Sequence, residues 1–521
     1  MKNSLVLIVG AGPTGMTAAI ELGRFGFDVR IVDRSEHLAE HSQALGVQAR
    51  TLEQFQRYAI ADIAVERGRK VTRAEFWSEG KKILSLPLSH ISSVYPFILL
   101  LPQSETEAIL NRHMEWLGIR PERGTELVDL SQHDDAVTAI LRNSNGDREE
   151  IHPRWVIGCD GAHSLIRQKL GIPFEGASIG MSFFLGDVQL DGPDAPTDQL
   201  SVHFHHGDVV FLARLTDKLF RIIVASHAMQ QSPLQKEVDL RHFQLALDAA
   251  GINAKAHSPE WMTPFHVNDR HARHYRVGNV FLAGDASHIH SPVGGQGMNT
   301  GIQDVANLAW KMAAVTRGAD IHLLNSYESE RGEVGKALLR FTERGLKLGS
   351  TTSSVLESMR DTFLPVLSAL KPVQRAMLGF ISETAIEYRS SWTVMDFGGD
   401  GDLRAGDRLL DFELKPNSER PMLQKRTLLQ DWTEPKHLAL LLEPTGAEVN
   451  ELRQTLPQAV VITVRAAELD RDGLRALGTS KKLLIVRPDG YIGFRGHAEP
   501  HTPWMEYAEQ DGILAPSLMT R

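Results

Sequence analysis

A glycine-rich stretch at residues 279–312, NVFLAGDASHIHSPVGGQGMNTGIQDVANLAWKM, carries the side chains and spacings best suited to chemistry. An apolar run leads into Gly284 and Asp285, a loop with one proline and three glycines follows, and an amphipathic pattern begins near Asn299. This order predicts a strand, a tight loop and a helix. Because the first N–H groups of a helix are free to donate, a carboxylate placed beside them suits a polar, partly anionic cofactor.

Flavin is the cofactor that this arrangement favours. Asp285 suits a ribityl or ribose hydroxyl, and the three loop glycines let backbone come within contact distance of a flat ring. The alternative is an ordinary strand, turn and helix with a flexible loop. The glycines concerned are Gly294, Gly295 and Gly297.

A second segment, near the N-terminus, has the pattern of a dinucleotide-binding unit. Apolar residues 5–9 run into GAGPTG, residues 16–25 have helical spacing, and residues 29–33 read as the next strand, which ends in Asp33. In such a unit glycines form the turn, a pyrophosphate lies at the helix start, and an acid about 20 residues further on binds ribose hydroxyls. The loop residues assigned to the cofactor are Gly10, Gly12, Pro13, Thr14 and Gly15.

A third segment, WVIGCDGAHS at residues 155–164, again ends an apolar strand in an acid and a glycine. Arg167 follows it, and Ser164 and Arg167 are spaced one helical turn apart. Taken by itself, this segment reads equally well as one more turn and helix cap.

In this order the three segments resemble the aromatic-ring hydroxylase family, the single-component flavoprotein monooxygenases that hydroxylate phenols. The resemblance rests on GAGPTG, GCDGAHS and AGDASHIHSPVGGQGMNTGIQDVANLAWK, and it spans most of the chain before the glycine run at residues 398–401. It implies an α/β protein. A Rossmann-like FAD-binding domain of the glutathione reductase type would occupy residues 1–180 and 270–395, and an inserted α+β substrate domain would occupy residues 181–269.

The resemblance implies particular contacts to the nucleotide half of FAD. Gly10, Gly12 and Gly15 would hold the pyrophosphate. Asp33 would bind the adenosine ribose, and Arg34, directly after it, would lie near the adenine.

It also implies the contacts around the flavin. Asp160 belongs to the motif that in this family serves both FAD and the nicotinamide nucleotide, and Asp285 is the expected ribityl ligand. Pro292 and residues 295–299 should line the isoalloxazine, with backbone amides near its pyrimidine edge, so Pro292 is placed at the catalytic centre. The other cofactor contacts expected are Arg50, Gln103, Val128, Gly284, Gly295, Gly297, Met298 and Asn299.

One position departs from the family pattern. Relatives often have an arginine where this chain has Gln43, at the start of the run QALG. Because that arginine bears on how nucleotide phosphates are held, NADPH and NADH both remain open as the reductant.

The region between residues 180 and 270 lacks nucleotide-binding signatures, and its side chains alternate in character as they do along a strand. This pattern predicts a sheet that covers the flavin ring and forms a substrate cavity. His203 and His205 fall on one face of a strand, because side chains alternate with period two. Either imidazole could take a phenolic proton, and His205 is the candidate catalytic base. The alternative is a solvent-facing pair beside the turn at residues 206–208.

A metal site is not predicted. His288 and His290 lie in the flavin loop as His-x-His, but no third or fourth ligand with suitable spacing is evident in the sequence.

The composition is that of an ordinary globular enzyme. The 521 residues are 42% hydrophobic and 23% charged, and a net charge of -9 without a basic stripe argues against nucleic-acid binding. The single cysteine, Cys159, excludes an intramolecular disulfide and fits a reducing cytoplasm. No stretch approaches the roughly 20 apolar residues that cross a bilayer, so membrane attachment is not predicted.

Residues 396–521 contain three apolar, strand-like runs at 438–442, 460–464 and 483–491, the last of which enters a P-D-G turn. This tail resembles the thioredoxin-like C-terminal domain of the larger phenol hydroxylases. It has no cysteine, which excludes thiol redox exchange there. We expect it to serve in packing or in homodimer contacts.

The resemblance implies a reaction in two halves. NAD(P)H reduces FAD, and the reduced flavin takes up O2 as a C4a-hydroperoxide that hydroxylates a phenolic or polycyclic aromatic substrate. The protein orients the reactants and excludes water. Two alternatives stay open, a Baeyer–Villiger monooxygenase of a polyketide and a non-catalytic flavin-binding protein. The sequence does not distinguish a simple phenol, an aromatic acid and a polycyclic polyketide as substrate.

Overall fold

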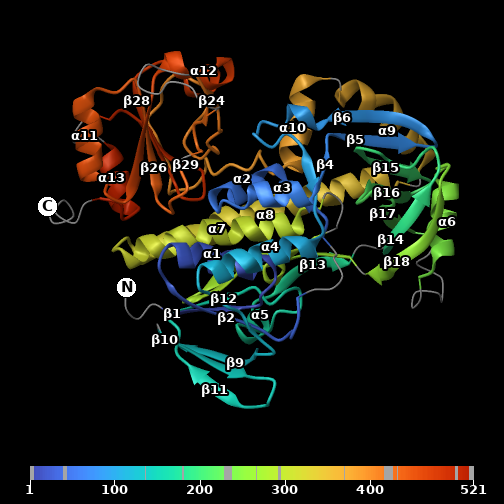
Figure 1. Cartoon of the computed structure of the whole chain (residues 1–521), viewed down its shortest axis with the longest axis horizontal. Coiled ribbons are helices and arrows are strands. Elements are labelled where there is room, and N and C mark those ends of the chain that lie inside the picture. Colours follow the sequence, from blue (N-terminus) through green and yellow to red (C-terminus); the bar gives the residue numbers. More distant parts are fainter. Residues whose placement is uncertain are drawn as a thin grey trace.

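The computed structural model describes residues 5–38, 44–134, 136–178, 181–227, 238–265, 267–290, 295–351, 353–368, 370–415, 426–430, 432–498 and 503–514. Figure 1 shows a layered α/β unit around the N-terminal strands, a second large sheet beside it, and a separate C-terminal sheet. Within the described ranges, no helix combines the length and apolar character needed to span a bilayer.

The first unit is built on a six-stranded sheet in the order β20-β21-β12-β1-β2-β8. Its central strands are parallel and form continuous apolar runs, as expected for strands that are covered on both faces. The strands are β1 (Leu5–Val9), β2 (Asp28–Asp33), β8 (Glu122–Arg123), β12 (Trp155–Gly158), β20 (Arg276–Val277) and β21 (Val280–Leu282).

Helices cover one face of this sheet and a smaller sheet covers the other (Figure 1). Because β1, β12 and β21 are parallel neighbours, the loops that follow them meet at one edge. These loops are the three motif segments of the sequence. The covering helices are α1 (Pro13–Arg24), α4 (Gln103–Trp116) and α7 (Gly297–Thr316), and the smaller sheet consists of β9 (Glu126–His133), β10 (Ala136–Arg142) and β11 (Arg148–Ile151).

The second sheet has seven strands, in the order β18-β14-β17-β16-β15-β5-β6. It is larger than the sheet expected at residues 181–269, because β5 (Arg73–Ser78) and β6 (Lys81–Pro87) join it through parallel pairing of β5 with β15. The other strands are β14 (Ser182–Asp191), β15 (Gln199–His205), β16 (Asp208–Arg214), β17 (Leu219–Ser226) and β18 (Lys255–Phe265).

The two faces of the seven-stranded sheet have different partners. Helix α6 (Leu240–Ala249) covers one face, where Val210 and Leu212 belong to the core. On the other face, Leu200 and Ala213 share a core cluster with Leu45 and with Leu378 of α10 (Lys371–Ile381). Leu45 precedes β3 (Gly46–Val47), and a Cβ on Gly295 would lie 3.9 Å from the Gly46 nitrogen, so this second face looks toward the glycine-rich loops.

The C-terminal unit has a five-stranded sheet in the order β23-β29-β28-β26-β27. The three strands expected there are present as β26 (His437–Leu442), β27 (Ala459–Val464) and β28 (Lys482–Val486). β26 is parallel to β27 and antiparallel to β28, which is antiparallel to β29. The remaining elements are β23 (Met395–Asp396), β29 (Ile492–Gly496), α11 (Gly446–Thr455), α12 (Arg471–Leu477) and α13 (Pro503–Gln510).

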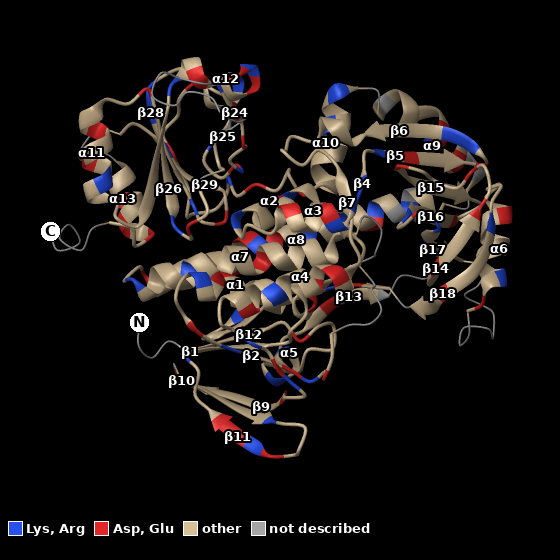
Figure 2. Cartoon of the chain, viewed as in Figure 1, with Lys and Arg blue, Asp and Glu red and all other residues tan. Residues whose placement is uncertain are grey.

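Charged side chains occupy the interface between this unit and the first one. Figure 2 shows acidic and basic positions interspersed along α2 (Ala49–Arg57), α7 and α8 (Asn325–Gly349), the helices that lie between the two sheets. Several of these charges are fully buried, so the C-terminal unit is an integral part of the molecule rather than an appended module.

Candidate active site

The start of α1 forms a cradle of free backbone amides. Its N-cap, Gly12, makes no side-chain cap, and a Cβ on Gly12 would meet no described atom within 4 Å. By contrast, a Cβ on Gly10 would overlap the carbonyl of Cys159, and a Cβ on Gly15 would overlap the carbonyl of Gly10. Gly10 and Gly15 are therefore required by packing, whereas Gly12 leaves room for a phosphate at the helix start.

Asp33 lies beside this cradle at the end of β2. Its carboxylate accepts hydrogen bonds from the backbone N–H of Ala11 at 2.6 Å and of Ser35 at 2.7 Å. These contacts fix the carboxylate next to the loop that would hold the pyrophosphate. Arg34 is exposed, and Val128 is half-buried on β9.

The start of α7 forms a second amide cradle. Gln296 is the N-cap and makes no side-chain cap, which leaves the amides of the first turn available. The Asn299 side chain donates to the carbonyls of Gly46 and Gly295, both at 2.8 Å, and accepts from the N–H of Gln48 at 2.9 Å. Asn299 therefore positions the surrounding backbone with its side chain.

Close glycine contacts bring the two cradles together. Gly284 has φ of +61°, and a Cβ there would lie 2.6 Å from Thr14 Oγ1. A Cβ on Gly301 would overlap the same hydroxyl. Thr14 of α1 is thus wedged between the β21 loop and α7, so both helix starts face one region.

Asp285 enters that region from the end of β21. Its Oδ1 lies 4.0 Å from the position of a Cβ on Gly297. The side chain is open to solvent on one side, while the protein around it raises the pKa of the carboxyl by desolvation. A carboxylate in this place can accept a hydrogen bond from a cofactor hydroxyl. Met298 is half-buried in the same turn, and Pro292 lies outside the described residues.

Asp160 and Arg167 join the third motif to the same region. Asp160 Oδ2 accepts from the Ile166 N–H at 3.2 Å, whereas its Oδ1 is buried and has no hydrogen-bond partner among the described residues, and burial raises the pKa of the carboxyl. Arg167 donates to the carbonyl of Ala286 at 2.9 Å, next to Asp285. An unsatisfied buried acceptor beside an open amide cradle fits a polar cofactor with hydroxyl groups.

A buried charge cluster that the sequence analysis did not identify supports the flavin loop. Asp304 of α7 accepts from the Gly284 N–H at 3.0 Å, from His288 Nε2 at 2.7 Å and from Arg331 Nε at 2.7 Å. Burial would raise the pKa of Asp304, but His288 and Arg331 lower it to about 2. His288 is therefore engaged as a partner of Asp304. The signal available in the sequence was Asp304, the one charged residue in the helical run of residues 302–310.

Gln103 and Arg50 have partners that differ from those expected. Gln103 Oε1 accepts from the Ala44 N–H at 3.3 Å and so steadies the segment that leads to β3. The Arg50 guanidinium pairs with Glu53 at 2.9 Å and donates to the Asp489 carbonyl of the C-terminal unit. These partners direct Arg50 to the interface between the two units, and its contact with the flavin stays a prediction.

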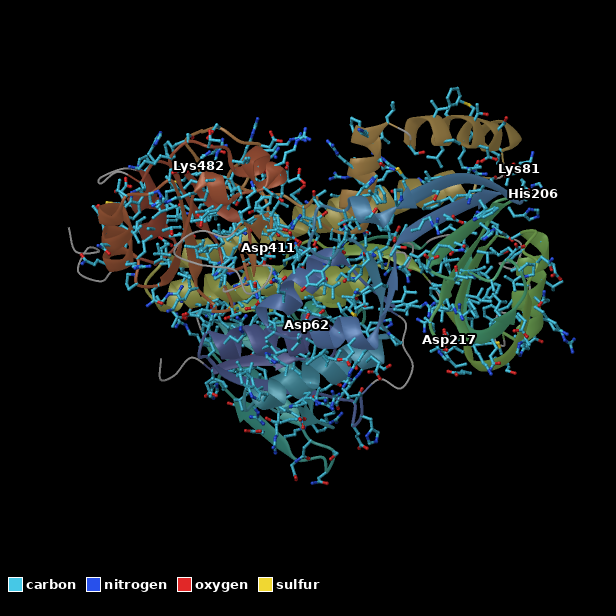
Figure 3. All side chains as sticks on the ribbon, turned by 45° about the horizontal axis from the view of Figure 1, so that its top comes forward. Asp62, Lys81, His206, Asp217, Asp411 and Lys482 are labelled. Atoms are coloured by element: carbon cyan, nitrogen blue, oxygen red, sulfur yellow. The ribbon has the colours of Figure 1, made fainter. Side chains whose placement is uncertain are left out.

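His205 also lies away from the cradles. His203 is opposite Val210 in the β15–β16 pair, which places both histidines on the α6 side of the sheet. His205 pairs with Glu79 at 2.9 Å, and its neighbour His206 lies at the outer tip of the sheet in Figure 3. The two histidines share a face, as the alternation predicts, and the role of His205 as catalytic base stays a prediction.

The face toward the glycine-rich loops carries a buried ion pair that the sequence analysis missed. Arg221 is opposite Ala213 and forms a bidentate salt bridge with Asp187, in which Nε and Nη2 donate to the two carboxylate oxygens at 2.8 and 2.7 Å. Trp261 Nε1 donates to the same carboxylate at 2.9 Å, and Arg221 Nη1 is buried with no hydrogen-bond partner in the described part of the chain. Around this pair the face is apolar, with Leu185, Val202, Phe211 and Ile223 in register.

Comparison with known proteins agrees with this geometry. Residues 3–342 match a family described as FAD binding domain. The chain is 33% identical to 6-methylpretetramide 4-monooxygenase of Streptomyces rimosus, over 94% of this chain and 90% of the relative. It is 34% identical to pentachlorophenol 4-monooxygenase of Sphingobium chlorophenolicum, over 94% and 86%.

Solved structures agree over almost the whole chain. An anhydrotetracycline hydroxylase from Streptomyces rimosus superposes with a TM-score of 0.79 at 28% identity, covering 98% of this chain and 99% of that one. An aromatic hydroxylase from angucycline biosynthesis gives 0.80 at 27% identity, covering 99% and 100%. With its open amide cradles, its convergent carboxylates and these matches, the chain belongs to the FAD-binding family of flavoprotein aromatic monooxygenases.

Proposed function

We propose that this protein is an FAD-dependent monooxygenase that uses NAD(P)H and O2 to hydroxylate a phenolic or polycyclic aromatic substrate. The observation that carries the proposal is the meeting of the α1 and α7 helix starts with Asp285 in one region. The full-length similarity to aromatic and polyketide monooxygenases supports it. No observation favours the Baeyer–Villiger or the non-catalytic alternative.

Each residue at the cradles has a distinct part in binding the cofactor. The amides at the start of α1 would bind the FAD pyrophosphate, with Asp33 toward the adenosine ribose. Asp285 would bind the ribityl chain, and the first amides of α7 would face the flavin pyrimidine edge. When bound, FAD supplies hydride acceptance from NAD(P)H and the activation of O2.

The seven-stranded sheet would supply the substrate side of the site. Its apolar face excludes water, which protects a reactive oxygenating site from side reactions. Arg221 holds a donor N–H without a partner within the described residues, and Asp187 and Trp261 fix its orientation. We propose that this donor recognises an oxygen substituent of a fused-ring substrate.

The C-terminal unit has the βαβαββα order and the 4-3-1-2 strand arrangement of a thioredoxin-like domain, counted from β26 to β29. We assign it that fold, with a structural rather than a redox role, because it contains no cysteine. A cytoplasmic location accords with the single thiol of the chain. We also propose that the protein forms a homodimer, which a measurement of its molecular mass in solution would test.

The test is NADPH oxidation by the FAD-loaded protein across a panel of phenols, aromatic acids and polyketide quinones, with product mass and hydrogen peroxide recorded. Stimulated oxidation and a hydroxylated product are expected with a fused-ring phenol. NADH in a parallel series identifies the preferred reductant. Oxidation that no aromatic compound stimulates, with peroxide as the sole product, would refute the proposal.

A further inference from the structure

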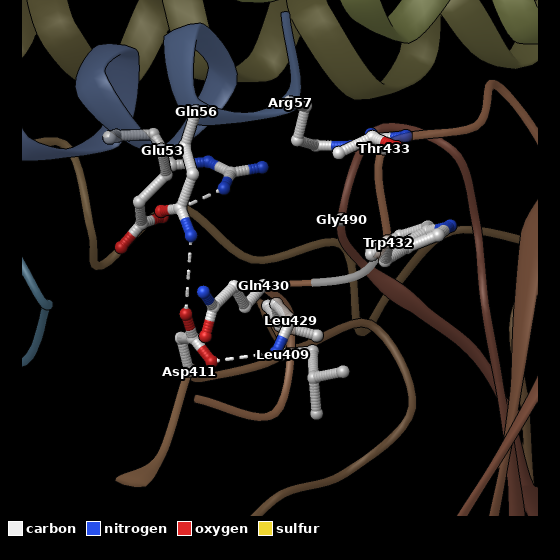
Figure 4. A pocket seen from close by; sticks show the side chains of 11 residues that line it. Glu53, Gln56, Arg57, Leu409, Asp411, Leu429, Gln430, Trp432, Thr433 and Gly490 are labelled. Atoms are coloured by element: carbon white, nitrogen blue, oxygen red, sulfur yellow. Dashed lines mark hydrogen bonds and ion pairs between the residues drawn. The ribbon is translucent and has the colours of Figure 1, made fainter. Parts of the chain in front are cut away.

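A pocket lies between α2 and the C-terminal unit, at the opposite end of α1 from the proposed pyrophosphate site. In Figure 4, Arg57 extends from α2 toward Trp432 and Thr433, whereas Asp411 lies across the pocket near Leu429. We call this space the interdomain pocket. The residues that line it include Glu53, Gln56, Arg57, Asp411, Trp432 and Thr433.

Arg57 is a half-buried cation that forms no ion pair among the described residues. Its Nε and Nη1 are buried and have no hydrogen-bond partner among the described residues, and no ion pair of Arg57 is present there. The guanidinium packs over the Trp432 ring at 4.2 Å. Burial lowers the pKa of Arg57 to about 10; Glu21 opposes this shift, whereas Arg24 and Arg50 add to it.

The nearby acids are already engaged. Glu53 pairs with Arg50 at 2.9 Å and with Arg408 at 2.6 Å. Asp411 accepts from the Leu429 N–H at 2.8 Å and from Gln56 at 3.5 Å.

Glu21, the remaining acid on this side of the molecule, accepts from the Tyr58 hydroxyl at 2.6 Å and lies 3.8 Å from Arg24. Glu21 is close enough to raise the pKa of Arg57, but no described acid forms an ion pair with its guanidinium. A buried charge is costly unless it is paired and hydrogen-bonded. The aromatic contact offsets part of that cost, but it leaves the in-plane N–H donors unused.

We propose that the interdomain pocket binds one small oxyanion, a phosphate or a carboxylate, through the Arg57 guanidinium. Planar guanidinium donors match the oxygens of both groups. The anion would fill the pocket between α2 and Trp432 and would stabilise the contact of α2 with the C-terminal unit. Helix α2 begins after its N-cap Gln48, which is held by Asn299, and ends at Arg57, so the site lies at the other end of α2 from the flavin loop.

The experiment is equilibrium dialysis of inorganic phosphate with the FAD-loaded full chain, at constant ionic strength. Loading with FAD fills the α1 cradle, so that phosphate cannot be counted there. We expect one saturable site per chain and a rise of roughly 2 °C in the unfolding temperature. Acetate and succinate in competition distinguish a free phosphate from a carboxylate as the preferred ligand.

The diagnostic variant is Arg57→Met, which keeps an apolar contact with Trp432. It should weaken anion binding roughly 30-fold or more. Arg57→Gln, which also removes the charge, serves if the first variant does not fold. The matched control is Arg475→Met, which removes an exposed arginine of the same C-terminal unit and should leave binding unchanged. Absence of saturable binding of either anion, or equal binding by the Arg57 variants, would overturn the proposal.

Discussion

Glu330→Gln is the substitution that most directly probes how the C-terminal unit supports the flavin helix. Glu330 of α8 is fully buried and pairs with Lys311 of α7 at 2.9 Å and with Arg487 of the C-terminal unit at 2.8 Å. Asn307 of α7 donates to Glu330 at 2.7 Å and to Asp489 of the C-terminal unit at 2.9 Å. One carboxylate therefore links both units to α7.

The expected loss of unfolding free energy follows from the two buried cations that the substitution leaves without the Glu330 charge. Burial alone would raise the pKa of Glu330, but Arg487 and Lys311 hold it well below its usual range, so the carboxylate is charged in the wild type at neutral pH. In the variant, the Lys311 and Arg487 side chains stay buried without this counter-charge. Removing one partner of a buried pair costs roughly 3–5 kcal/mol of unfolding free energy.

The assay is urea unfolding of the FAD-loaded protein, followed by both tryptophan and flavin fluorescence. We expect the variant to release flavin at lower urea and to lose roughly 3–5 kcal/mol of unfolding free energy. Glu333→Gln on the same helix is the matched control, because its carboxylate is exposed and pairs only with Lys336 among the described residues. If Glu330→Gln unfolds within about 1 kcal/mol of this control, the reasoning fails.

Three further predictions concern the cradles, a buried acid and the substrate face. Gly12→Ala should weaken FAD binding in a flavin fluorescence titration without lowering the unfolding temperature, whereas Gly15→Ala should lose roughly 1–3 kcal/mol of stability, since its Cβ overlaps the Gly10 carbonyl. Burial raises the pKa of Glu383 from its ordinary 4.5 to about 8, so its contribution to stability is complete below pH 4.5 and is lost as pH rises to 8. In thermal unfolding from pH 5 to 8, Glu383→Gln should lack this decline, which amounts to a few kcal/mol at most. The double variant Asp187→Asn with Arg221→Met, which removes both charges of the pair, should raise the KM for the aromatic substrate roughly tenfold in NADPH oxidation assays and leave FAD binding unchanged. An unchanged KM would contradict a substrate contact at Arg221.

The cofactor elements were predictable from the sequence because each motif contains its own strand, turn and helix signals. The comparisons confirm FAD as the cofactor and the aromatic hydroxylase family. Asp285 and the glycines lie where a local pattern implies, since chain order alone brings parallel strand ends to one edge.

Other features depend on contacts between distant segments. β5 pairs with β15 across more than a hundred residues of sequence, and no local pattern reports that pairing. The alternation of side chains predicted that His203 and His205 share one face of a strand, but it did not reveal which face of the sheet looks toward the site. Arg50 matched a family position, yet its partner Asp489 lies in the C-terminal unit.

Incorporation of oxygen-18 from labelled O2 is the measurement that tests the central claim most directly. The FAD-loaded protein would turn over a fused-ring phenol with NADPH, and the product would be analysed by mass spectrometry and NMR. The account predicts one labelled oxygen on a ring carbon. Label in a ring-expanded lactone, or peroxide as the only product with every aromatic compound, would contradict it.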